Sequence, residues 1–150
     1  MEDLGWLRES LGEQVRVAPY NGTVMFAMNV SRPPFDDAAL RKAMVLAVDR
    51  DLLTQQLLKG LYTSAYGIVP PLPDYSPQRP DWANLDDAAR REQARALYAG
   101  AGYSPERPLK VELTVPIGSP EMRRVLEALS AMWRMNLGAE VSVVTEEFRV

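Results

Sequence analysis

The sequence predicts an α/β fold in which a mixed sheet containing a βαβ unit is flanked by helices. Three stretches carry this prediction: a largely apolar segment at 23–30, an alternating strand at 109–115, and a second apolar strand at 139–145 that follows a helical segment at 120–137. A strand, a helix and a strand in succession form a βαβ unit, in which we expect parallel strands and a right-handed connection.

Composition limits the classes of protein that need to be considered. At 150 residues, of which 47% are hydrophobic and 25% charged, the chain has the size and composition of one globular domain. The net charge of −3 and the scattered basic residues argue against nucleic acid as a partner. The nearest basic cluster, Arg90, Arg91 and Arg95, lies among acidic residues and is interpreted as a solvated helix face. Because the chain has no cysteine and no histidine, it cannot form disulfides, thiolate nucleophiles, histidine triads or most zinc sites.

The first 22 residues are expected to form a connector that leads into the main unit. Residues 3–11 can form a short helix that Gly12 ends, and residues 15–20 alternate as an extended segment before an Asn21-Gly22 turn. No apolar run reaches the length of about 20 residues that a membrane span requires. Met1 is followed by two acidic residues, so we expect no signal peptide in this chain.

Residues 23–30 are predicted to form a strand inside the sheet, because their side chains are apolar on both faces. One face carries Val24, Phe26, Met28 and Val30, and the other carries Met25 and Ala27. Pro33 and Pro34 cannot donate to a sheet and are expected to end the strand.

Four further segments have helical spacing or helix-capping residues. Asp36 or Asp37 is expected to cap the first helix, whose apolar stripe comprises Leu40, Ala43, Met44, Ala47 and Val48. Asp49 or Asp51 caps a second helix that ends at Gly60, Asp86 caps a third, and Ser119-Pro120 begins a fourth that Gly138 closes. The connection over residues 61–85 contains five prolines and four aromatic residues, and we expect the aromatic residues to pin it to the rest of the molecule.

Catalytic chemistry has little support in the sequence. The pairs Asp36-Asp37 and Asp86-Asp87 are explained as helix caps, and the neighbours Glu146 and Glu147 face opposite sides of a strand, so they form no dyad. No spacing of carboxylates suggests a metal site, and no glycine-rich loop suggests a phosphate site. Trp133 is interpreted as a core residue. Two alternatives stay open: an α/β enzyme fragment that uses Glu146 or Glu147, and a stand-alone interaction module that dimerises.

Four strings, in order along the chain, carry a resemblance to a known family. They are YNGTVMFAMNVSRPPFDDAALRKAMVLAVDRDLL, GIVPPLPDYSP, ARALYAGAGYSPERPLKVELTV and ALSAMWRMNLGAEVSVVTEEF. Together they resemble the extracytoplasmic solute-binding proteins of peptide-type ABC importers, the extracellular solute-binding proteins of family 5, which bind oligopeptides, dipeptides, nickel chelates and some sugars.

This resemblance implies one lobe of a type II periplasmic-binding-protein-like fold. Residues 1–22 would be the incoming connector and residues 23–150 a partial C-terminal lobe, excised from a longer two-lobed protein. The implied function is capture of a peptide or similar small solute by lobe closure, followed by delivery to an ABC permease. It further implies a periplasmic or extracytoplasmic location, membrane association in the full-length protein, no enzymatic activity and no cofactor.

Few ligand contacts can be carried over from the family. Its crossover strand has one side toward the cleft, which makes Tyr20, Met25 and Ala27 the candidate ligand-binding residues, with Val24 and Phe26 as the alternative face. Oligopeptide-binding relatives often have several tyrosines there, so the apolar residues of this chain would remove hydroxyl partners. A single lobe is expected to bind solute weakly or not at all, and surface exposed by truncation could support an artificial dimer.

Overall fold

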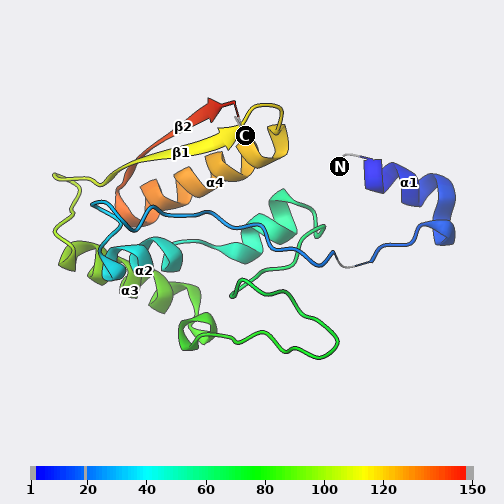
Figure 1. Ribbon diagram of the computed structural model, residues 1–150, viewed down its shortest axis with the longest axis horizontal. Coiled ribbons are helices and arrows are strands. Elements are labelled where there is room, and N and C mark those ends of the chain that lie inside the picture. Colours follow the sequence, from blue (N-terminus) through cyan, green and yellow to red (C-terminus); the bar gives the residue numbers. More distant parts are fainter. Residues whose placement is uncertain (1–2, 19, 148–150) are drawn as a thin grey trace.

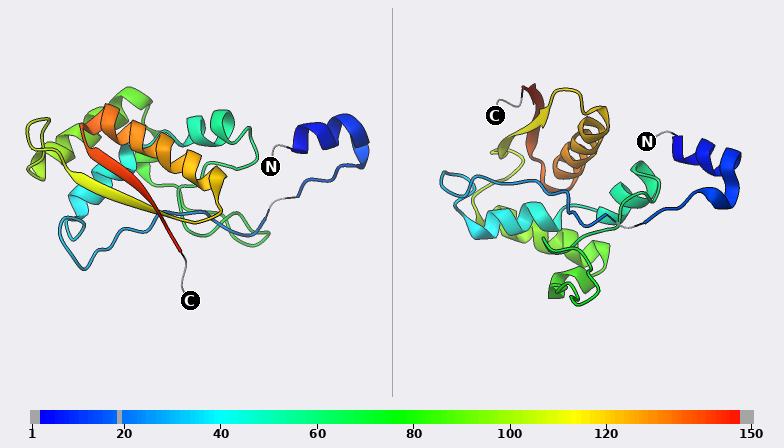
Figure 2. Two further views of the ribbon diagram at one scale, coloured as in Figure 1. Left: turned by 90° about the horizontal axis from the view of Figure 1, so that it is seen from above. Right: turned by 45° about the vertical axis from the view of Figure 1, so that its right-hand side comes forward.

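A computed structural model describes residues 3–18 and 20–147 and arranges them in layers (Figure 1). A two-stranded sheet lies on one side, helix α4 (Pro120–Leu137) covers it, and helices α2 (Ala38–Leu46) and α3 (Asp87–Gly100) form the next layer. Helix α1 (Asp3–Leu11) stands apart from these layers at the end of an extended segment, as the additional views confirm (Figure 2). The predicted α/β class and the short N-terminal helix are therefore confirmed.

The sheet and its connecting helix form the predicted βαβ unit. Strands β1 (Lys110–Pro116) and β2 (Glu140–Glu146) are parallel, and Lys110 lies opposite Glu140 and Pro116 opposite Glu146. On one face of β1, Val111 and Val115 are buried. The alternating positions Lys110, Glu112 and Thr114 are exposed. The sheet therefore has one packed face and one polar face.

Residues 23–30 do not form the predicted strand. The segment is extended but has no strand partner among the described residues, and Val24, Met25 and Val30 are 54%, 54% and 55% exposed. Met28 is half-buried and packs against the core. The prediction of a strand covered on both faces was wrong because apolar character shows that a segment favours burial without specifying what buries it. The described sheet thus has two parallel strands and is not the mixed sheet that we expected.

The helix boundaries follow the predicted capping residues. Asp37 Oδ1 accepts hydrogen bonds from the backbone N–H groups of Ala39 (2.7 Å) and Leu40 (3.3 Å), and Asp86 Oδ1 accepts one from Ala89 (2.8 Å). Such caps satisfy N–H groups that have no partner within the helix. Gly138 ends α4 with a φ of 73°, a left-handed conformation that suits glycine.

The second predicted helix takes a different form. Asp49 Oδ1 accepts from the Leu52 backbone N–H (2.9 Å), as expected of a cap, but the residues Leu52–Leu57 are π-helical. The Leu58 N–H donates to the Leu53 carbonyl five residues earlier at 2.9 Å. Gly60 follows with a φ of 72°, which agrees with its predicted role at the end of the segment.

The core is formed by α2, α3, α4 and the packed face of the sheet. The apolar stripe of α2 and the two residues after it is at most 9% exposed: Leu40, Ala43, Met44, Ala47 and Val48. Trp133 of α4 is 4% exposed, and its Nε1 donates to the Met44 carbonyl at 2.8 Å. This contact confirms that Trp133 is a core residue. Asn136 Nδ2 makes a similar bond to the Ala47 carbonyl, also at 2.8 Å.

Arg50 pins the long connection 61–85, as the aromatic residues in that connection led us to expect. Its Cζ lies 5.0 Å from the ring centroid of Trp82 and 5.4 Å from that of Tyr66, and its Nε donates to the Ala65 carbonyl at 3.1 Å. Arg79 lies over the same Tyr66 ring at 4.2 Å. Contacts of a guanidinium with aromatic faces are attractive and gain strength as water is removed. Burial lowers the pKa of Arg50, which remains a cation.

The interpretation of Arg90 as part of a solvated face was wrong. Its side chain is 9% exposed and pairs with Asp87, with 2.6 Å between Arg90 Nη2 and Asp87 Oδ1. Its Nε has no hydrogen-bond partner among the described residues. Mixed charge in the sequence did not distinguish this buried arginine from Arg95, which is exposed.

Tyr98 gives the fold a dependence on alkaline pH. The side chain is 3% exposed, and its hydroxyl oxygen accepts a hydrogen bond from the Leu109 N–H at 2.8 Å. Burial raises the pKa of Tyr98, and the Leu109 bond opposes this shift more weakly. Because the folded state holds the neutral phenol, stability should be constant below the unfolded pKa of about 10 and fall as pH rises through the folded pKa.

We expect Tyr98→Phe to cost about 1–3 kcal/mol at neutral pH, because it leaves the buried Leu109 N–H unsatisfied. In the same variant, the decrease in stability at alkaline pH should be smaller than in the wild type. The remaining decrease should come from Tyr62, whose pKa is also raised by burial. Urea denaturation at several pH values measures both effects. The exposed Tyr75→Phe is the control, and an equal alkaline fall in Tyr98→Phe and wild type would contradict the assignment.

Candidate functional site

The three predicted ligand-binding residues lie on the extended segment and face solvent. Tyr20 is 88% exposed and Met25 is 54% exposed, and Ala27 is also exposed. The alternative pair, Val24 and Phe26, is 54% and 39% exposed. The segment therefore presents both sets of side chains, and exposure does not select between them.

Local contacts hold the segment at both of its ends. The Gly22 N–H donates to the Tyr20 carbonyl at 2.9 Å, and a side chain at position 22 would collide with the Tyr20 ring. At the other end, Asn29 Oδ1 accepts from the Ser31 N–H at 3.0 Å, and Met28 anchors the segment to the core. The residues between these two ends therefore lie at the surface of the molecule.

The candidate segment is electrically neutral. No Asp, Glu, Lys or Arg occurs between Arg16 and Arg32. The segment can offer van der Waals contact, the Tyr20 hydroxyl and backbone hydrogen-bonding groups, but no charged partner for a ligand. This chemistry suits an uncharged or hydrophobic part of a ligand.

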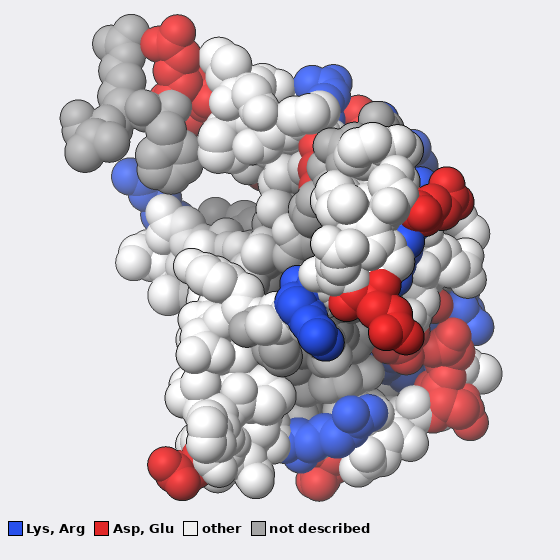
Figure 3. Space-filling view, turned by 90° about the vertical axis from the view of Figure 1, so that its right-hand side faces the viewer, with Lys and Arg blue, Asp and Glu red and all other residues white. Residues whose placement is uncertain are grey.

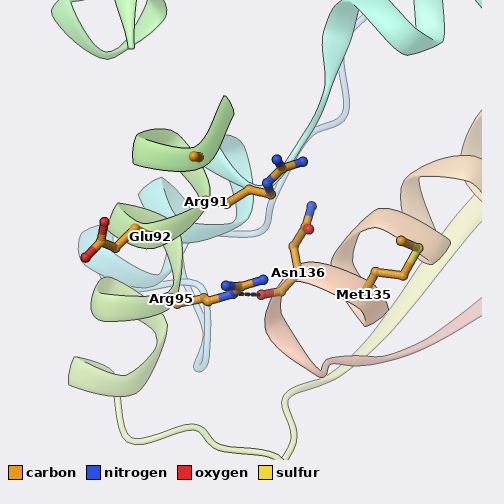
Figure 4. Close-up of a pocket in the computed structure, with 6 residues that line it drawn as sticks. Arg91, Glu92, Arg95, Met135 and Asn136 are labelled. Atoms are coloured by element: carbon orange, nitrogen blue, oxygen red, sulfur yellow. Dashed lines mark hydrogen bonds between the residues drawn. The ribbon is translucent and has the colours of Figure 1, made fainter. Parts of the chain in front are cut away.

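A separate hollow of about 700 Å³ lies between α3 and the C-terminal end of α4 (Figure 4). Its lining comprises Ala88, Arg91, Glu92, Arg95, Met135 and Asn136. Arg95 Nε donates to the Asn136 carbonyl at 3.0 Å, and the Asn136 amide is already bonded to Ala47. Arg95 and Asn136 therefore join neighbouring elements to one another. The sequence analysis missed the hollow because it depends on how two distant helices pack.

The two glutamates considered as catalytic candidates lie at the end of β2. Glu146 ends β2, and both it and Glu147 are exposed. Within residues 3–18 and 20–147, no group of three acidic side chains could hold a metal ion. Among the same residues, no helix is both long enough and apolar enough to cross a membrane.

The charged side chains are intermixed on the face shown in Figure 3. Blue and red groups lie next to one another there, beside a large uncharged area, and no extended patch of one sign forms on that face. A nucleic-acid interface would need a basic stripe or patch. This face does not offer one.

Comparison with known proteins gives one family. Residues 3–150 match the family described as bacterial extracellular solute-binding proteins, family 5 Middle. The chain is 31% identical to the periplasmic oligopeptide-binding protein OppA of Escherichia coli over 144 residues, covering 95% of this chain and 26% of that protein. It is 33% identical to the probable deoxycholate-binding periplasmic protein YgiS of E. coli, again covering 95% of this chain and 26% of the relative.

Solved structures agree with the sequence comparison. The E. coli murein tripeptide binding protein MppA superposes with a TM-score of 0.88 at 28% identity, over 98% of this chain and 29% of MppA. Haemophilus influenzae OppA, solved in complex with the peptide RPPGFSPFR, gives a TM-score of 0.86 at 28% identity over the same shares. The chain thus spans 26% of the length of OppA and YgiS from E. coli. It belongs to the bacterial extracellular solute-binding proteins of family 5.

Proposed function

We propose that this chain forms part of the C-terminal lobe of a two-lobed solute-binding protein that serves an ABC importer. The complete protein would capture a peptide or similar small solute by closing its lobes, and would deliver it to a permease from the periplasmic or extracytoplasmic side. The observation that carries this proposal is the family match over residues 3–150. Relatives named as oligopeptide-binding and murein peptide-binding proteins support the choice of solute.

We assign residues 1–22 to a connector and residues 23–150 to the partial lobe. In support, α1 stands apart from the layered part of the molecule, to which an extended segment joins it (Figure 2). The boundary between residues 22 and 23 is argued from the described residues, which exclude positions 1, 2, 19 and 148–150.

Tyr20, Met25 and Ala27 are proposed to form part of the ligand-facing wall. Their exposure and the neutrality of the segment support contact with an uncharged part of the solute. One relative is named as a probable deoxycholate-binding protein, and deoxycholate is a largely apolar molecule, which supports the choice of an uncharged contact. Binding of this kind requires neither catalysis nor a cofactor, and we propose neither for this chain.

Chemical-shift mapping tests the assignment of the wall. With micromolar protein and millimolar tripeptide, we expect trileucine to shift the backbone amide signals of Tyr20, Met25 and Ala27 in fast exchange, since one wall provides few contacts. Trilysine should shift them less. The Met25→Lys variant should lose the response, whereas Met135→Lys, which changes an exposed methionine on α4, should keep it.

Shifts centred on Arg91 and Asn136 would instead place the ligand in the hollow between α3 and α4. No shift at the segment with trileucine would remove the proposed wall. Either outcome contradicts the assignment of Tyr20, Met25 and Ala27.

A further inference from the structure

We draw no further inference here: the strongest candidate, the hollow between α3 and the C-terminal end of α4, has Arg95 and Asn136 in its lining already bonded to neighbouring elements, and nothing in the part of the chain that the structure describes shows what covers it.

Discussion

Replacing Trp133 with alanine is expected to lower the free energy of unfolding by about 3–5 kcal/mol, which is a large share of the stability of a small domain. The side chain is 4% exposed and lies between α4 and α2. The change creates a cavity and also leaves the Met44 carbonyl without the Trp133 Nε1 donor at 2.8 Å. Urea denaturation followed by circular dichroism measures the loss.

Two control variants separate the causes. Trp133→Phe keeps most of the volume and removes the hydrogen bond, so it should cost about 1–3 kcal/mol, less than alanine. Trp6→Ala changes a side chain on α1 that is 64% exposed and should alter stability by no more than about 0.5 kcal/mol. If Trp133→Ala cost no more than Trp6→Ala, Trp133 would not belong to the core.

Replacing Arg50 with methionine should release the connection 61–85. The variant keeps a long apolar side chain but loses the cation over Tyr66 and Trp82 and the bonds to the carbonyls of Ala65, Val45 and Val48. We expect a loss of about 2–4 kcal/mol, since charged hydrogen bonds and partly desolvated cation–π contacts each contribute roughly 1–2 kcal/mol. Limited chymotrypsin digestion should cut the connection faster, because the aromatic residues Tyr66, Tyr75 and Trp82 lie in it.

Arg50→Lys and Arg134→Met are the matched comparisons. Lysine retains the charge but lacks the planar group that stacks on rings, so it should restore little of the protection. Arg134 is exposed on α4, and its replacement should leave digestion unchanged. Equal digestion rates for wild type and Arg50→Met would show that the connection is held by other contacts.

The elements that were predicted correctly are those that local chemistry determines. Asp37 and Asp86 accept hydrogen bonds from N–H groups within three residues, and Gly138 supplies the left-handed residue after a helix. The apolar stripe around Leu40 and Met44 could be predicted from the helical period of 3.6 residues alone, without knowing which element packs against it. Such features can be read from a few neighbouring residues.

The errors arose where the outcome depends on distant parts of the chain. Residues 23–30 have the composition of a buried strand, but no described strand pairs with them. The Arg90 side chain is only 9% exposed, which its charged neighbours in sequence did not indicate. The π-helical turn at Leu52–Leu57 arises from a shift of one residue in hydrogen-bond register, which periodicity does not resolve.

The candidate site stays a prediction, and the sequence places it no more closely than one segment. The family resemblance pointed to the region of Tyr20, Met25 and Ala27, and the structure shows these side chains to be exposed. Which face of the segment meets a ligand is not determined locally, since Val24 and Phe26 are also exposed. In the proposed two-lobed protein, that choice would depend on the part that closes over the segment.

We propose that this chain holds one wall of a binding cleft and needs the opposite lobe for affinity, because closure stabilises a ligand that contacts both lobes. The most direct measurement is a calorimetric titration of the 150-residue chain with a mixture of short peptides. We predict no binding tighter than a dissociation constant of about 1 mM. Saturable binding with a dissociation constant near 1 μM would show that the chain forms a complete site by itself, and would contradict the account.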